Sequence, residues 1–138
     1  MYQKKLETDI RSPLEYGMKL LAGKWRSRIV CLIGGMGSMR FGELKAELVN
    51  ISDGVLASTL NELIALELVE KCSISERTAL SEYRLTEKGS SIIPLLQQLC
   101  RWSGAYYKSK NGITMGHCRQ CDFFRQWSEE IEESDPEK

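Results

Sequence analysis

Residues 51–69, ISDGVLASTLNELIALELV, contain the clearest helix signal in the chain. Ser52 suits the N-cap of a helix, because its hydroxyl can accept a hydrogen bond from a free amide of the first turn. Apolar residues then recur at helical spacing and predict one buried stripe, made of Leu56, Leu60, Leu63 and Ile64. The opposite face is small, polar and almost uncharged, and it carries Asp53, Gly54, Ala57, Ser58, Asn61 and Ala65. Helix faces that only meet water usually carry Lys, Glu and Arg, so this face indicates a surface with a further role.

The rest of the chain predicts an ordered series of elements around this helix. Helices are expected over residues 13–21, 23–35 and 40–48, and a tight turn over 49–52 in which Asn50 can adopt a left-handed conformation. Two strands are expected over 69–75 and 81–85. Thr86 is expected to cap a final helix that runs to about Lys108, and Pro94 is expected to kink or shorten it.

Helix, tight turn, helix and two-stranded hairpin is the order of a winged helix-turn-helix, a mainly α fold of the α+β class. In that fold the second helix of the pair enters the major groove of DNA. The residues expected to read bases are then Gly54, Ala57, Ser58 and Asn61. Taken alone, the helix fits equally well a solvated face on a structural domain, because four-residue turns between amphipathic helices are common.

Four motifs extend this prediction: GKW at 23–25, RFGEL at 40–44, IS..VL...L.EL at 51–63 and Y.LTEKG at 83–89. In this order and spacing the chain resembles the HxlR-type winged helix-turn-helix regulators of bacteria, over roughly residues 12–108. The resemblance implies a homodimeric transcription factor that binds double-stranded DNA and has no enzymatic activity. It also implies extra N- and C-terminal helices that form the dimer.

The chain departs from that family at three places, one of which is the wing, where relatives often carry PP.V.Y and this chain reads RTALSEY. The family usually has a Cys-Pro pair at the start of the first helix, where the cysteine of some members senses oxidants, and this chain has Ser12-Pro13. The outer face of the family's recognition helix usually carries Lys, Gln and Arg, and the matching positions here hold Gly54, Ala57, Thr59 and Asn61. The sequence of the operator therefore cannot be transferred from relatives.

Contacts to DNA phosphates are expected from basic side chains at loops and helix starts, and from helix amide ends. Lys24 and Arg26 begin the second helix, Arg40 precedes the third, and Arg77 lies at the tip of the wing, with Lys71 on the strand that leads to it. The predicted phosphate contacts are Lys24, Arg26, Arg40, Ser52 and Arg77.

The final helix carries an apolar stripe longer than a single small winged domain needs to cover, which favours a partner. The predicted dimer interface consists of Leu14, Ile93, Leu96, Leu99, Trp102 and Tyr106. A two-fold dimer would place two recognition helices about 34 Å apart, one turn of DNA, on a palindromic operator. The alternative is that the stripe packs only within its own chain. A small-molecule effector could bind between the final helix and the body of the dimer, beside Trp102, Tyr106 and Tyr107.

Composition sets the remaining limits. The chain has 138 residues, 42% of them hydrophobic, and a formal net charge of zero, which argues against a strongly basic nucleic-acid binder but not against a local basic patch. No apolar run approaches the roughly 20 residues that span a membrane, and MYQKKLETDI lacks the apolar core of a signal peptide. A cytoplasmic protein with no membrane partner is expected.

The predicted domains are an N-terminal arm (1–11), the winged helix-turn-helix domain (12–108) and an appendage with an acidic tail (109–138). The appendage holds a Cys-x-x-Cys pair, Cys118 and Cys121, beside His117. Zinc, a redox-active dithiol and two thiols without a role are the three alternatives, and because a structural zinc site needs four ligands, no cofactor is expected.

With one histidine, no glycine-rich phosphate loop and no triad spacing, an enzyme is not expected. Two alternative functions remain: a winged-helix module that docks to protein and does not bind DNA, and a regulator that responds to thiol oxidation or to metal through Cys118 and Cys121.

Overall fold

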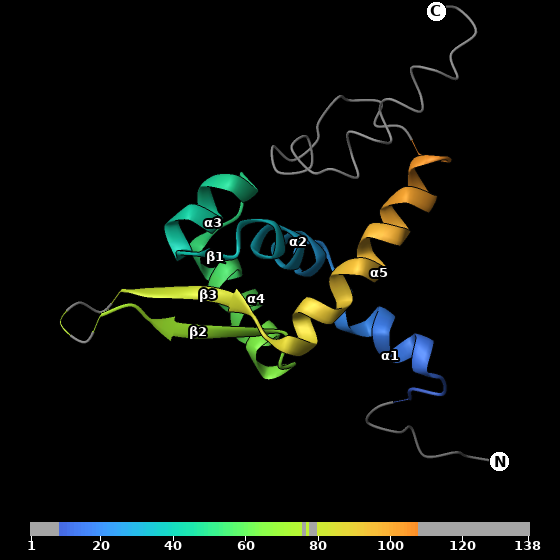
Figure 1. Ribbon diagram of the computed structural model, residues 1–138, viewed down its shortest axis with the longest axis horizontal. Helices are drawn as coiled ribbons and strands as arrows, with labels where there is room; N and C mark the ends of the chain where they lie inside the picture. The colour runs from blue at the N-terminus through green and yellow to red at the C-terminus, as the bar shows by residue number, and fades with distance from the viewer. Residues whose placement is uncertain (1–8, 76, 78–79, 108–138) are drawn as a thin grey trace, which may run out of the picture.

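The computed structural model describes residues 9–75, 77 and 80–107. Helices pack around a small antiparallel sheet, and the β2–β3 hairpin projects from one end (Figure 1). The elements are α1 Pro13–Leu20, α2 Arg26–Met36, β1 Ser38–Met39, α3 Phe41–Leu48, α4 Asp53–Ala65, β2 Val69–Ser73, β3 Ser81–Leu85 and α5 Glu87–Gly104. This order confirms the predicted winged helix-turn-helix.

The sheet contains a strand that the sequence analysis did not predict. β3 lies in the middle, with β2 on one side and the two-residue strand β1 on the other, and both pairs are antiparallel. Met39 and Lys71 are both opposite Tyr83, so the three strands are in register at this point. Two residues are too few to show the alternation by which a strand is recognised, whereas a free edge of β3 can pair with any extended segment beside it.

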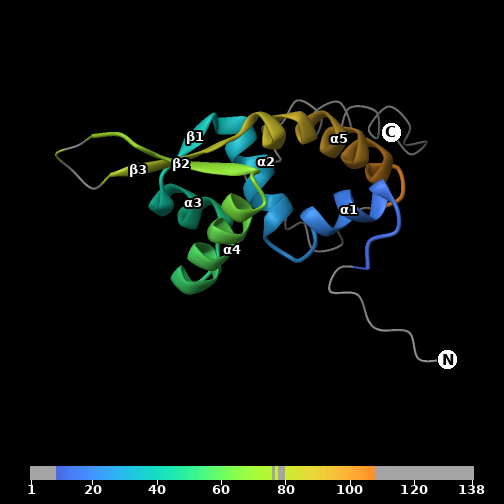
Figure 2. The same cartoon turned by 90° about the horizontal axis from the view of Figure 1, so that it is seen from below.

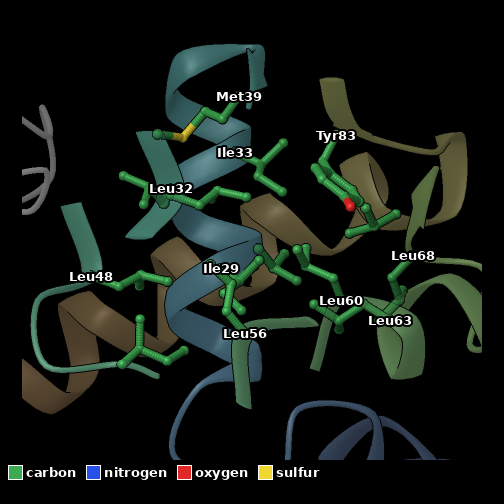
Figure 3. Close-up of a cluster of buried hydrophobic side chains, with 14 of the residues drawn as sticks. Ile29, Leu32, Ile33, Met39, Leu48, Leu56, Leu60, Leu63, Leu68 and Tyr83 are labelled. Carbon is green, nitrogen blue, oxygen red and sulfur yellow. The ribbon is translucent and has the colours of Figure 1, made fainter. Parts of the chain in front are cut away.

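The core forms around α2, which lies between the helix-turn-helix and α5. Ile29, Val30, Leu32 and Ile33 of this helix are all buried (Figure 3). The predicted stripe of α4 faces them: Leu56, Leu60 and Leu63 are at most 1% exposed, and Ile64 is half-buried. Since burying a leucine side chain contributes about 1.5–3 kcal/mol, this stripe fixes the rotation of α4 about its own axis.

Local hydrogen bonds set where most helices begin. Ser52 accepts from the amide of Val55, and Thr86 accepts from the amide of Gly89, which confirms both as N-caps. In the turn between α3 and α4, Asn50 has φ 63°, as predicted. Val49 before it has φ 49°, which is rare for a β-branched residue. The turn is therefore tighter than Asn50 alone indicates.

Three predicted boundaries were wrong by more than one residue. α2 begins at Arg26 and not at Gly23, because Gly23 has φ 92° and ends the preceding turn. β2 ends at Ser73, before the predicted residue 75. α5 continues through Pro94 and ends at Gly104. Pro94 is exposed, so water can bond the carbonyl that its missing amide leaves free.

The molecule has two distinct ends. In both views α3, α4 and the hairpin lie on one side of α2, and α1 and α5 lie on the other (Figures 1 and 2). Across the described residues, no helix is long and apolar enough to cross a membrane.

Candidate nucleic-acid interface

The outer face of α4 consists of Gly54, Ala57, Ser58 and Asn61, all of them exposed. Their spacing is i, i+3, i+4 and i+7, so they form one continuous stripe, opposite the buried leucines. A Cβ atom built on Gly54 would meet nothing within 4 Å. Space is therefore not the reason for glycine at this position, and the surface is low enough for another backbone to approach closely.

Thr59 does not belong to this face, contrary to the expectation drawn from the family pattern. Its side chain is buried, and its hydroxyl donates to the carbonyl oxygen of Val55 at 2.7 Å. The residue lies about 100° around the helix from Ser58, which turns it toward the body of the domain. It is unavailable for base contacts.

The start of α4 is electrically balanced by the neighbouring helix. Asp53 is the acidic residue of the first turn, and Lys45 Nζ of α3 lies 2.5 Å from its Oδ1. A carboxylate at a helix start interacts favourably with the helix dipole but repels phosphate. Lys45 offsets this repulsion and joins the two helices of the helix-turn-helix. Ser52, a predicted phosphate contact, uses its oxygen to cap the helix.

A group of basic residues lies between α3 and the hairpin. Arg40 and Lys71, both exposed, line a hollow of about 620 Å³ together with Phe41, Gly42, Glu43, Leu80, Ser81 and Tyr83. The carboxylate of Glu43 accepts a hydrogen bond from the backbone amide of Arg40 at 3.0 Å. This bond involves the backbone of Arg40 and not its guanidinium. Arg77, beyond the end of β2, is also exposed. Arg40 and Lys71 thus share one hollow between α3 and the hairpin, and Arg77 is a third exposed cation beyond the end of β2.

The basic residues at the start of α2 differ from one another. Lys24 is exposed, and its Nζ lies 4.8 Å from the centre of the Trp25 ring. Arg28, which the sequence analysis did not single out, lies 4.9 Å from the same ring. Arg26 is only 23% exposed at its side chain and is bonded to Glu62 of α4. Lys24 keeps a charge available to solvent, whereas that of Arg26 is shared with a carboxylate.

On the hairpin, Arg84 is also committed to a carboxylate. Its Nε lies 2.6 Å from Glu70 Oε1 on the adjacent strand. This hydrogen bond, together with the nearby thiol of Cys72, raises the pKa of Arg84 above its usual value. Arg84 therefore stays charged but neutralises Glu70, and it adds little to the positive surface.

At the other end of the molecule, α1 and α5 expose large apolar side chains. Of the predicted interface residues, Leu14, Leu99, Trp102 and Tyr106 are exposed, and the rings of Trp102 and Tyr106 lie 5.3 Å apart. Met18, Leu95 and Tyr107 are exposed as well. We call this set the apolar end.

Two predicted interface residues belong to the core of their own domain. Leu96 is 7% exposed, and Ile93 packs against the core beside Gly34. The first half of α5 covers α2 and the second half extends past it, so one apolar stripe is buried in its first part and exposed in its second. Assigning Leu96 to a partner surface was wrong.

The cysteines also differ in how far they are exposed. Cys31 and Cys72 are half-buried, and Cys100 is exposed. Cys118 and Cys121 lie outside the residues that the structure describes. Within residues 9–75, 77 and 80–107, no group of three His, Cys, Asp or Glu side chains could hold a metal ion.

Comparisons with known proteins agree with this geometry. The model of the HxlR-like helix-turn-helix family matches residues 20–111. The HTH-type transcriptional regulator YdzF of Bacillus subtilis is 35% identical over 95 residues, which cover 69% of this chain and 87% of the relative. An HTH-type transcriptional regulator of Methanothermobacter thermautotrophicus is 36% identical over 93 residues, 67% of this chain and 70% of the relative.

Solved structures give the same result. The reduced form of the transcriptional regulator YodB from B. subtilis superposes with a TM-score of 0.64 at 28% identity, covering 75% of this chain and all of YodB. The redox regulator HypR in its reduced form superposes with a TM-score of 0.63 at 28% identity, covering 68% of this chain and 92% of HypR.

Proposed function

Because the chain belongs to the HxlR-like helix-turn-helix family, whose members are DNA-binding transcriptional regulators and not enzymes, we propose that it acts as a homodimer on a palindromic operator. α4 enters the major groove of each half-site, and the hairpin lies along the adjacent backbone. The observation that carries this proposal is the exposed stripe of Gly54, Ala57, Ser58 and Asn61 on α4.

Within this stripe, Ser58 and Asn61 supply the hydrogen-bonding groups. An asparagine amide can donate and accept at once, and its geometry fits the N6 and N7 edge of adenine. Gly54 and Ala57 leave room for the helix to lie deep in the groove. The reading of sequence then rests on few side chains, so shape and flexibility of the DNA contribute to specificity as well.

Phosphate contacts come from the cations around this stripe. We assign Lys24, Arg40 and Arg77 to the DNA backbone, with Lys71 beside Arg40, and the helix start at Ser52 adds amide groups. Arg26 is excluded from this set because Glu62 neutralises it. Four cations predict a steep fall of affinity as salt rises, because each neutralised phosphate releases counterions.

The dimer is formed through the apolar end. Exposed side chains as large as Leu99, Trp102 and Tyr106, in α5 and directly after it, are unusual for a monomer, because contiguous apolar surface favours association. This surface lies opposite the hairpin (Figure 2), so two copies can join there while both α4 helices remain free to meet DNA.

Selection of operators tests the proposal directly. The full-length protein is used to enrich sequences from a random double-stranded pool, and the selected DNA is footprinted and its affinity measured over a series of salt concentrations. We expect a two-fold symmetric footprint with half-sites about one helical turn apart, and dimers by sedimentation. Failure to enrich any sequence at low salt, where phosphate contacts are strongest, would contradict DNA binding and favour docking to protein.

A second candidate function is favoured by the solved neighbours YodB and HypR, which are described in reduced or oxidised forms. We propose that Cys118 and Cys121 respond to oxidants, since Ser12 stands where some relatives carry a sensing cysteine. A mild oxidant should change the affinity for the selected operator in the wild type and leave it unchanged in the Cys118→Ser, Cys121→Ser double variant. Equal affinity of oxidised and reduced wild type would exclude this route.

A further inference from the structure

Arg26 joins three elements at the start of α2. Its Nε and Nη2 donate to Oε2 of Glu62 on α4, at 3.2 and 3.1 Å. Its Nη1 donates to the carbonyl oxygens of Lys19 and Leu20, at 3.1 and 3.5 Å. These two carbonyls belong to the last turn of α1, where helix carbonyls have no partner within the helix. One planar guanidinium therefore links the end of α1 to the recognition helix.

Lys88, at the start of α5, makes a second link of the same kind. Its Nζ donates to the hydroxyl of Tyr16 on α1 at 2.8 Å and to the carbonyl oxygen of Leu66 at 2.9 Å. Leu66 is the C-cap of α4. The ammonium also lies 5.5 Å from the centre of the Tyr16 ring. α1 is thus bonded to the last turn of α4, at Glu62, and to its C-cap, Leu66, through two cations.

Little else fixes α1 to the domain. Leu20 is its one buried residue, and Leu14, Tyr16 and Met18 are exposed. Figure 2 shows α1 opposite α5, at the end of the molecule away from the hairpin. A short helix with a single buried side chain is free to rotate unless polar contacts restrict it, because few apolar contacts oppose the motion.

We propose that Arg26 and Lys88 are positioning residues that set the angle between α1 and the recognition helix, and so decide which spacing of half-sites the dimer accepts. The inference rests on the proposed function, in which the apolar end including α1 forms the dimer and α4 reads the DNA. If the dimer holds α1, any rotation of α1 against α4 changes the distance between the two recognition helices. Rigid links hold the two recognition helices at one distance from each other. The dimer then binds operators with the matching half-site spacing more tightly than operators with other spacings.

The two possible roles of Arg26, phosphate contact and positioning of α1, predict different effects of removing its partner Glu62. If Arg26 bound phosphate, removing Glu62 would free a positive charge and raise DNA affinity, and removing Arg26 would lower the salt slope by about one. If Arg26 positions α1, removing either partner breaks the same link. Both single variants then lose affinity for the same DNA, and the double variant loses no more than either one.

The experiment uses the operator selected by the wild-type protein, the same operator with its spacer changed by one or two base pairs, and an isolated half-site. Each added base pair rotates one half-site by about 35°. The variants are Arg26→Gln, Glu62→Ala, their combination and Lys88→Met. Glu47→Ala, which removes the same charge from the exposed surface of α3, is the matched control. Thermal unfolding of each variant shows which are folded at the temperature of the assay.

We expect Arg26→Gln and Glu62→Ala each to bind the selected spacing about five- to tenfold more weakly, with half-site affinity within about twofold of wild type. The wild type should reject a spacer changed by one base pair by about tenfold or more, and the variants by about threefold or less. Lys88→Met should act in the same direction, and Glu47→Ala should match the wild type.

Folded variants with the spacing preference of the wild type, or tighter binding by Glu62→Ala, would overturn the positioning role and leave the proposed function standing. A wild-type protein that enriches no sequence would overturn both.

Discussion

Asn61 carries the largest polar side chain on the exposed stripe of α4. Replacing it with alanine should lower affinity for the selected operator by about 1–3 kcal/mol, because one bidentate base contact is lost. Affinity for random DNA should hardly change, and the helix should become slightly more stable, since alanine is the better helix former. Titration of both DNAs measures the ratio, and an equal loss on both would show that Asn61 contacts the backbone instead.

Gly54 separates the stability of α4 from its function. Since a Cβ there meets open space, Gly54→Ala should stabilise the fold by about 0.5 kcal/mol. If DNA approaches the helix closely at this point, the same methyl group should weaken operator binding. Gly42→Ala is the matched control, because Gly42 is also the second residue of its helix and also faces open space.

Denaturant unfolding and operator titration of the two variants decide the point. Both should be stabilised, and only Gly54→Ala should lower the ratio of operator to random-DNA affinity. An unchanged ratio for Gly54→Ala would mean that DNA does not approach the start of α4.

Among the contacts between elements, that of α5 with Leu68, the residue before β2, explains the glycine of the Y.LTEKG motif. A Cβ on Gly89 would overlap with the backbone carbonyl of Leu68, which also accepts from the amide of Thr86 at 3.0 Å. This carbonyl cannot move without breaking that bond. α5 can therefore begin directly beside the sheet only if this position lacks a side chain.

Gly89→Ala should accordingly destabilise the protein by about 2–3 kcal/mol, because the overlap forces the backbone apart. Gly17→Ala in α1 is the contrasting variant: nothing lies within 4 Å of that position, so alanine should stabilise the helix by about 0.5–1 kcal/mol. Chemical denaturation of both variants gives the comparison. A fully stable Gly89→Ala would show that the close approach of α5 is not required.

The division of the whole molecule into a core and an exposed apolar end separates two leucines of α5 that lie one helical turn apart. Leu99 is 55% exposed in the apolar end, whereas Leu96 is 7% exposed in the core. Leu99→Glu should convert the dimer to a monomer with little loss of fold stability, because it places a charge in the proposed interface. Sedimentation of the variant at micromolar concentration measures this directly.

Two further variants complete this comparison. Gln98→Glu adds the same charge at the exposed residue directly before Leu99, and this variant should remain dimeric. Leu96→Ala should lower the free energy of unfolding by about 2–4 kcal/mol through a core cavity. Leu99→Glu that sediments as the wild type does would move the interface away from the apolar end.

The sequence by itself determined the features that depend on neighbours along the chain. The caps at Ser52 and Thr86, the left-handed Asn50 and the buried stripe of α4 all follow from bonds or spacings within four residues. These predictions were confirmed because they depend only on residues close together in the chain. Together they predicted the winged helix-turn-helix and the exposed stripe of the candidate site. Contacts of single residues with DNA remain predictions.

Only the tertiary structure decided which residues far apart in the chain meet. Arg26 was predicted from its position to contact phosphate, and the fold brings its guanidinium to Glu62, 36 residues away. The two-residue strand β1 exists because β3 offers it an edge. Leu96 and Leu99 are alike in sequence, and α2 covers one and leaves the other exposed. Pairing and burial of this kind depend on the relative placement of whole elements, which no local pattern of residues encodes.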